Sequence, residues 1–436
     1  MEKDKISLFS AIMMNINIMV GAGAFIMPTI MAQKAGSLSF LGWIGVGVIF
    51  LPLVWSIAQI TKLFPGQNSF YSYAEKGINK TAGFTSGWSY FLGYAAMAAV
   101  VNMALVEILA NQIKLAVIAN NIMLFNAIFV FLFCILNLLK ISNIGKIQNT
   151  STILKLIPLI FVILMIAFYY NPHLTFPLNN IYQVGYTLPL AVFGFWGFEA
   201  SCNIAHLISG DKRNAFRAVL IGFFCAVLIY TLFHFGILHI MNVQNLINYG
   251  APNFVKFLNI KSMSLLTLFN AIITSAIVTS YASCVFGIIL SVSANLYSMA
   301  QQNLFPFSST LQKKNNNDRP VYCIWLIGIT IILLIAILQN KIILTCISNL
   351  GTLSAFVLTM IAMIRLQIKN NNHLLQKIPT ILAFGSCFII IYYCWLVVGA
   401  DQISRLINLL PLIFLVISGI IMFKLNARKL NARNES

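Results

Sequence analysis

Residues 17–28 read Asn17-Ile-Met-Val-Gly-Ala-Gly-Ala-Phe-Ile-Met-Pro28, an apolar stretch interrupted by Gly21, Gly23 and Pro28. Glycine lowers helix stability by roughly 1 kcal/mol relative to alanine, and proline removes a backbone donor. Inside a lipid bilayer, the N–H and C=O groups freed in this way must find other partners. A helix break at this point therefore indicates a cavity in which backbone groups bind something polar.

A second stretch, Phe193-Gly-Phe-Trp-Gly-Phe-Glu199, repeats the pattern with Gly194 and Gly197. The two stretches begin successive sets of five predicted helices. Paired interruptions at corresponding positions are typical of inverted-repeat transporters with a site near the bilayer midplane. Close packing of helices through small residues is the alternative explanation for these glycines. The five-helix spacing, with Pro28 and Glu199 beside the glycines, favours the transporter.

Apolar runs of membrane-spanning length recur along the whole chain. Of the 436 residues, 60% are hydrophobic and only 8% are charged, which is too little charge for a soluble surface of this size. A span needs about 20 apolar residues. We predict an all-α integral membrane protein, 1–436, as a single domain with repeat one at about 7–170, repeat two at about 184–364 and extra helices at about 379–425. The twelve predicted spans are 7–31, 38–61, 83–110, 118–139, 150–170, 184–208, 215–240, 264–299, 321–339, 342–364, 379–400 and 403–425.

The net charge of +18 lies in short loops between the apolar runs, which excludes nucleic acid as the partner. If the N-terminus is inside, twenty of the 27 Lys and Arg residues fall in cytoplasmic segments and six in outer loops, while Lys155 lies within a span. This excess follows the positive-inside rule and predicts that both termini are cytoplasmic. The expected location is a bacterial inner membrane. The expected partners are the lipid bilayer and a small substrate, and a homodimer is left open.

Other classes of protein explain the pattern less well. The eight cysteines fall in or beside apolar runs without a Cys-x-x-Cys pair, and the five histidines are scattered, so we expect no metal, no cofactor and no membrane-embedded enzyme. A channel would not explain the paired breaks. A major-facilitator transporter would carry a basic Gly-x-x-x-Asp-Arg loop after the second helix, where this chain has Pro65–Tyr73. The alternative that the protein is a membrane receptor, which senses amino acids without transporting them, is left open.

The chemistry of a helix break points to the substrate. The N-terminus of the second half-helix presents a positive dipole end to an anion such as a carboxylate, and unwound carbonyl groups accept hydrogen bonds from an ammonium. A zwitterion satisfies both requirements. The sequence therefore predicts transport of an amino acid or a related amine.

Further motifs follow these stretches in order. Residues 65–73 read Pro-Gly-Gln-Asn-Ser-Phe-Tyr-Ser-Tyr, residues 211–218 form a basic loop, and residues 297–320 include Tyr-Ser-Met-Ala and Arg-Pro. Residues 394–401 read Cys-Trp-Leu-Val-Val-Gly-Ala-Asp. With the two glycine stretches, they resemble the amino acid–polyamine–organocation (APC) family of permeases over most of the chain. The last motif is similar to that family's bacterial basic amino acid/polyamine antiporter branch.

The resemblance implies the LeuT-type 5+5 inverted repeat with broken helices 1 and 6, and alternating access by an exchanger or a proton-coupled permease. In such a site, the substrate carboxylate would meet backbone N–H groups near Ala22, Gly23 and Ala24, and the amine would meet carbonyl groups near Met19 and Phe193.

The resemblance also places side chains around the substrate. The pocket would be shaped by Met97, Ala98 and Trp196. Phe193 and Ile288 stand where the arginine/agmatine antiporters have tryptophans, so stacking on a guanidinium is not implied, although Phe193 keeps an aromatic lid.

Two ionisable residues inside predicted spans are candidates for coupling. A charged carboxylate is costly in the membrane, so Glu199, just past the second break, is predicted to take up and release a proton during transport, with a structural carboxyl as the alternative. In some family members a lysine on helix 5 occupies the site at which sodium-coupled relatives bind sodium. Lys155 would then link helix 5 to the helix 1 break as a substitute for the ion. Snorkelling of Lys155 to the cytoplasmic edge is the alternative.

Overall fold

The computed structural model describes residues 5–63, 70–111, 116–172, 174–211, 213–370, 374–399 and 401–434. Within these ranges the chain is helical, apart from loops and two isolated β-bridges. This confirms the prediction of an all-α protein. The helices in the first half are α1 Leu8–Met19, α2 Ala22–Ala35, α3 Leu41–Leu63, α4 Phe70–Gly77, α5 Lys80–Asn111, α6 Ala116–Asn120, α7 Ile122–Leu136, α8 Ile141–Tyr169, α9 Leu188–Phe195 and α10 Ala200–Asn203. The second half contains α11 Asn214–Tyr249, α12 Met263–Gln301, α13 Ser308–Leu311, α14 Val321–Leu338, α15 Lys341–Lys369, α16 Leu374–Val398 and α17 Gln402–Asn434. Short 3₁₀ helices are η1 Gly36–Phe40, η2 Leu178–Thr187, η3 Ala205–Leu207 and η4 Ala251–Phe257.

Nine helical stretches in the described part of the chain are long and apolar enough to cross a membrane. The first, Leu8–Ile60, covers two of the twelve predicted spans. The predicted span 118–139 is divided into α6 and the shorter apolar helix α7, and the predicted span 184–208 is interrupted between α9 and α10. Large apolar side chains are exposed along α7, α8, α14 and α17, as expected for helices that face lipid. The protein is therefore a multi-pass membrane protein.

Several helices extend past their predicted ends. Helix α8 begins at Ile141, nine residues before the predicted start, and α17 continues to Asn434, beyond the predicted end at 425. The added turns are polar, so a search for apolar runs does not detect them. Helix α4 lies where a loop was predicted, while the turn Phe64–Asn68 lies outside the described residues.

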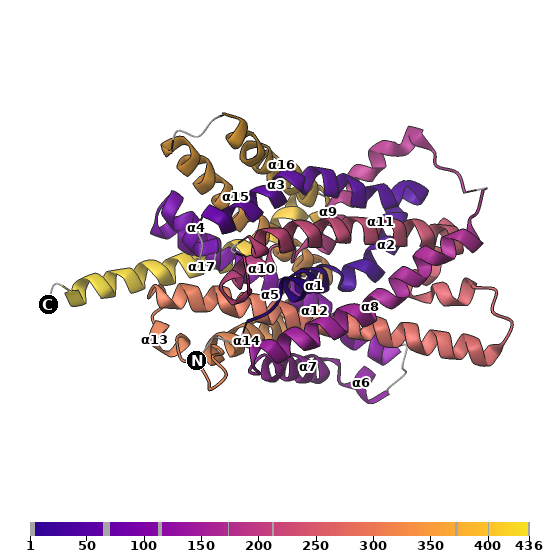
Figure 1. Cartoon of the computed structure of the whole chain (residues 1–436), viewed down its shortest axis with the longest axis horizontal. Coiled ribbons are helices and arrows are strands. Elements are labelled where there is room, and N and C mark those ends of the chain that lie inside the picture. The colour runs from indigo at the N-terminus through magenta and orange to yellow at the C-terminus, as the bar shows by residue number, and fades with distance from the viewer. Residues whose placement is uncertain are drawn as a thin grey trace.

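Helix α1 lies near the centre of the bundle (Figure 1), and its residues 13–19 are all buried. It packs against α8, α11 and α12, while α5 packs against α12 and α15. The last turns of α17 stand out from the body of the protein toward the C-terminus (Figure 1). The break between α1 and α2 is thus enclosed by helices that are far away in sequence.

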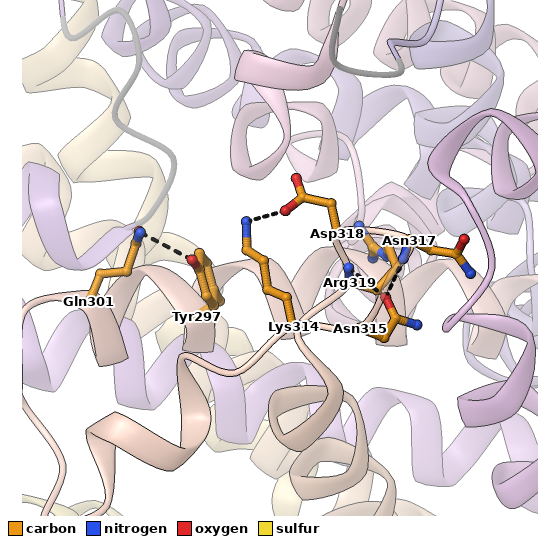
Figure 2. Close-up of polar contacts among 7 residues, drawn as sticks. All are labelled: Tyr297, Gln301, Lys314, Asn315, Asn317, Asp318 and Arg319. Carbon is orange, nitrogen blue, oxygen red and sulfur yellow. Dashed lines mark hydrogen bonds and ion pairs between the residues drawn. The ribbon is translucent and has the colours of Figure 1, made fainter. Parts of the chain in front are cut away.

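The loop between α13 and α14 fastens α14 to the end of α7. Side-chain amides of Asn315 and Asn317 donate to the carbonyl oxygen of Leu138 at 2.8 and 2.9 Å, and Arg319 Nε donates to Asn137 O at 3.2 Å. Figure 2 shows that Asn315 also accepts from the backbone of the following loop residues, at 3.0 Å. Because these donors converge on one helix end, the loop holds a fixed position.

Candidate substrate site at the two broken helices

The first break comprises Val20 and Gly21. Val20 leaves helical geometry with ψ 65°, and Gly21 adopts φ −106° and ψ −133° before α2 begins at Ala22. A Cβ on Gly21 would lie 2.6 Å from Cys284 Sγ, so only glycine fits beside α12. Gly23, expected at the break, lies instead in the first turn of α2, where the absence of a side chain allows another helix to approach.

The carbonyl groups freed at the end of α1 all accept hydrogen bonds from the protein. The ammonium of Lys155 donates to Asn17 O and Val20 O at 2.8 and 2.9 Å. Cys284 Sγ donates to Ile18 O at 3.1 Å. The hydroxyl of Tyr230 donates to Met19 O at 2.5 Å. The oxygen side of the break is therefore supplied with donors from α8, α11 and α12.

Lys155 is fully buried, and its ammonium lies at the break. Besides the two carbonyls of α1, it donates to Ser280 O on α12 at 3.3 Å. One cation thus joins three helices through backbone oxygens. These are the hard oxygen ligands that a small metal cation would use.

The N–H side of the same break is different. Helix α2 starts at Ala22, and within the described residues no side chain caps its N-terminus at Gly21. The first N–H groups of a helix have no partner inside the helix and attract negative charge. The backbone of Ala22, Gly23 and Ala24, predicted to meet a carboxylate, therefore offers donors there.

The second break comprises Trp196 to Glu199, between α9 and α10. Gly197 has φ +114°, which side-chain-bearing residues rarely adopt, and a Cβ there would lie 2.7 Å from Ile18 Cβ. Gly194, expected at the break, lies inside α9. A Cβ on Gly23 would lie 2.9 Å from Gly194 Cα, so these two glycines mark the point where α2 and α9 meet.

The N-terminal half of the first broken helix and the C-terminal half of the second are also joined. Asn15 Nδ2 donates to Ser201 Oγ, and Ser201 N donates to Asn15 Oδ1, both at 2.9 Å. Nearer the N-terminus, Ile6 N donates to Leu207 O and Ser209 N donates to Ile6 O, both at 2.8 Å. The segment from Ile6 to Met19 is therefore attached to the chain from Ser201 to Ser209.

Glu199 is fully buried at the end of the second break. Its Oε1 atom accepts from the hydroxyl of Tyr94 and, at 3.1 Å, from that of Tyr90. Asn203 Nδ2 in turn donates to Tyr90 Oη and Ser291 Oγ, both at 2.9 Å. Among the described residues, Glu199 Oε2 has no hydrogen-bond partner. One oxygen of this buried carboxyl is thus held by two tyrosines of α5.

The remaining predicted site residues are buried in the same core. Trp196 Nε1 donates to Asn349 Oδ1 on α15 at 2.6 Å, and its ring lies against Phe50 and Phe356 with centroids 5.7 Å away. The other predicted pocket residues are 0–2% exposed: Met97, Ala98, Phe193 and Ile288. No group of three or more His, Cys, Asp or Glu in the described residues could hold a metal.

Sequence reasoning missed Tyr230, Tyr94 and Asn15, which make some of the most direct contacts with the two breaks. Each is a polar residue inside an apolar run, a type of position that is often functional in membranes. Many other polar residues also lie inside apolar runs of this sequence, so the pattern alone does not single out these three. Only the fold shows which of them reach the breaks.

Two interrupted helices that meet inside a helical membrane bundle are typical of secondary transporters. The sequence pattern of the amino acid permease family matches residues 6–417. The chain belongs to this family, part of the APC superfamily.

Curated relatives are similar to the chain over half or more of its length. A serine/threonine exchanger of Bacillus subtilis is 22% identical over 348 residues, covering 78% of this chain and 77% of the relative. The gamma-aminobutyric acid permease of Escherichia coli is 22% identical over 332 residues, covering 72% and 69%. An arginine/agmatine antiporter of Chlamydia felis is 29% identical over 249 residues, covering 50% and 49%. These relatives are transporters and not enzymes.

Proposed function

We propose that the chain carries an amino acid across the cytoplasmic membrane of a bacterium by alternating access around the two breaks. In this proposal twelve helices span the membrane, the first ten form two inverted sets of five, and both termini are cytoplasmic. The loop charges support that orientation, since it would place twenty Lys and Arg residues in cytoplasmic segments and six in outer loops.

One observation carries the proposal: the carbonyl groups at the first break have hydrogen-bond partners from side chains, and the N–H groups at the start of α2 have no side-chain cap among the described residues. The donors to these carbonyl groups are Lys155, Cys284 and Tyr230. A site that offers N–H donors and a positive dipole end selects an anion. A substrate carboxylate fits this position, with Phe193, Met97, Ala98, Trp196 and Ile288 around the rest of the molecule.

Coupling would involve Lys155 and Glu199, which are both fully buried. Lys155 would replace a bound sodium ion, because its ammonium lies among backbone oxygens of α1 and α12. Glu199 would carry the proton, because one of its oxygens has no partner among the described residues. The transporter would then work as an exchanger or a proton-coupled permease without sodium.

Counterflow in proteoliposomes tests the function. The purified full-length chain is reconstituted into proteoliposomes, which are loaded with unlabelled serine, threonine, glutamate, arginine or gamma-aminobutyric acid. Uptake of the same compound in labelled form is then measured. We expect exchange of at least one amino acid. If no compound exchanges, the transporter proposal fails, and saturable binding without flux would identify a sensor.

Decarboxylated competitors test the carboxylate site. Ethanolamine lacks the carboxylate of serine, and agmatine lacks that of arginine. If the N-terminus of α2 binds the carboxylate, each amine should compete at least about tenfold less well than its parent, since charge-assisted hydrogen bonds contribute roughly 1.5–3 kcal/mol. Equal competition by amine and parent would exclude the carboxylate site while leaving transport itself intact.

A further inference from the structure

The hydroxyl of Tyr230 lies between the two broken helices. It contacts Met19 O at 2.5 Å and Gly194 O at 2.9 Å, so carbonyl groups from α1 and α9 converge on one phenol. The side chain is 1% exposed. The same oxygen lies 3.8 Å from the place that a Cβ on Gly23 would occupy, next to the open N-terminus of α2. Tyr230 thus occupies the position where the head group of an amino acid would bind.

A phenol supplies only one hydrogen to these two oxygens. Met19 O also accepts from Gly21 N at 2.7 Å, but α9 ends at Phe195, so Gly194 O lies among the last carbonyls that have no partner in the helix. An ammonium has three hydrogens and a full charge, and its hydrogen bonds to carbonyls are stronger than those of a neutral donor. The pair of carbonyls is better matched to an ammonium than to Tyr230.

The phenol ring is held rigidly from the other side. It stacks on Trp43 with ring centroids 4.3 Å apart and an interplanar angle of 13°. Trp43 Nε1 donates to His234 Nδ1 at 3.0 Å, so the neutral imidazole carries its hydrogen on Nε2, which lies 3.1 Å from Ser39 Oγ. Ser39 Oγ donates to Gly36 O at 2.6 Å. Each donor in this series of hydrogen bonds has an acceptor, so Trp43 has a fixed position and holds the stacked ring of Tyr230.

We propose that Tyr230 substitutes for the substrate ammonium when the transporter is empty. Its hydroxyl donates its hydrogen bond to the carbonyl groups of Met19 and Gly194 in the empty protein, and a substrate amine replaces it as the donor when the substrate binds. This inference rests on the proposed function as an amino acid transporter. Because the empty site keeps its carbonyls hydrogen-bonded, the empty protein can close and change its orientation. Tyr230 therefore permits net transport in addition to exchange.

The substitution Tyr230→Phe removes the hydroxyl and keeps the ring on Trp43. During exchange, substrate occupies the site at every reorientation. Its ammonium then donates hydrogen bonds to the two carbonyl groups, so removal of the Tyr230 hydroxyl has little effect on counterflow. In net efflux one reorientation occurs empty, with Gly194 O buried and without its donor, which is unfavourable. We expect the ratio of net efflux to counterflow to fall by about five- to tenfold, a size set by one unsatisfied buried group. The apparent KM for exchange should fall as well, because the competing hydroxyl is gone.

The experiment uses full-length protein in proteoliposomes and the labelled amino acid that gives the fastest counterflow in the panel above. Tyr281→Phe is the matched control, since Tyr281 is 2% exposed on α12 and the same atom is removed. That control should leave the ratio unchanged. If Tyr230→Phe lowers efflux and counterflow equally, or raises KM, the hydroxyl is only structural and the inference is overturned. Failure of the wild type to exchange any amino acid would instead reject the proposed function.

Discussion

The ammonium group of Lys155 lies 2.9 Å from the carbonyl oxygen of Val20, the residue at which the first helix breaks. Ser280 Oγ donates to the same oxygen at 3.0 Å, so helices α8 and α12 both hold this point. The carbonyl at which the first helix breaks is therefore held by donors from two other helices. The position of Lys155 links the stability of the break to a single side chain.

We expect Lys155→Met to abolish transport and to lower the melting temperature in detergent. The substitution removes the donor shared by Asn17 O, Val20 O and Ser280 O, and each buried acceptor left without a partner costs about 1–3 kcal/mol. Differential scanning fluorimetry and counterflow measure the two effects. Lys146→Met is the control, because Lys146 is exposed on the same helix. Wild-type activity in Lys155→Met would rule out the role as an ion substitute, and so would a sodium requirement of the wild type.

We expect Glu199→Gln to retain exchange but to lose the pH dependence of uptake. Glutamine keeps the size of the side chain and its contact with Tyr94, yet it cannot bind or release a proton. Uptake at an inside-negative potential is measured between pH 5 and pH 8. Glu107→Gln serves as the comparison, since Glu107 pairs with Lys341 and is partly exposed. An unchanged pH profile in Glu199→Gln would show that this carboxyl is structural.

The sequence predicted the class of fold because its signals are local. Apolar runs, loop charges and two glycine stretches located the helices and the two breaks. The residue at which each helix stops could not be predicted, because Gly23 and Gly194 serve close approach between helices while Val20 and Trp196 leave helical geometry. The partners of the break could not be predicted either. Tyr230 is more than 200 residues from Met19, and only packing joins them.

We expect Gly197→Ala to abolish transport and to destabilise the fold by at least about 1–3 kcal/mol. Gly197 has φ +114°, and the added Cβ would overlap with Ile18. Gly385→Ala is the matched control, because nothing lies within 4 Å of a Cβ there and the residue is inside helix α16. Alanine favours a helix interior, so this variant should be as stable as the wild type or more so. Equal stability and transport of the two variants would contradict the requirement for glycine at position 197 in the second break.

The loop drawn in Figure 2 allows a buried cation to be compared with an exposed ion pair. Burial lowers the pKa of Arg319 to about 10, so it stays charged at neutral pH while donating to Asn137 O. Partial burial lowers the pKa of Lys314, but the hydrogen bond to Asp318 and the charge interactions with Tyr297 and Asp318 outweigh it and place that pKa above its usual value. The stabilisation that Lys314 contributes to the pair with Asp318 is therefore present below that raised pKa and is lost as the pH rises through it.

At neutral pH we expect Arg319→Ala to lower the melting temperature clearly, because a hydrogen bond from a charged group contributes about 1.5–3 kcal/mol. Asp318→Asn should change it little, since exposed ion pairs contribute about 1 kcal/mol or less. Thermal unfolding of both variants, followed by tryptophan fluorescence, makes the comparison. A larger loss in Asp318→Asn than in Arg319→Ala would contradict this interpretation of the loop.

The backbone pairing of Ile6 with Leu207 and Ser209 has a practical consequence for labelling the protein. A fluorescent domain fused in front of Ile6 would lie close to the C-terminal end of the second broken helix and would interfere with any movement there. The C-terminal turns of α17 stand clear of the bundle (Figure 1), so a fusion there would lie away from both breaks. Small dyes at Ile6 and Ser209, in contrast, would report directly when the N-terminal half of the first broken helix separates from the C-terminal half of the second.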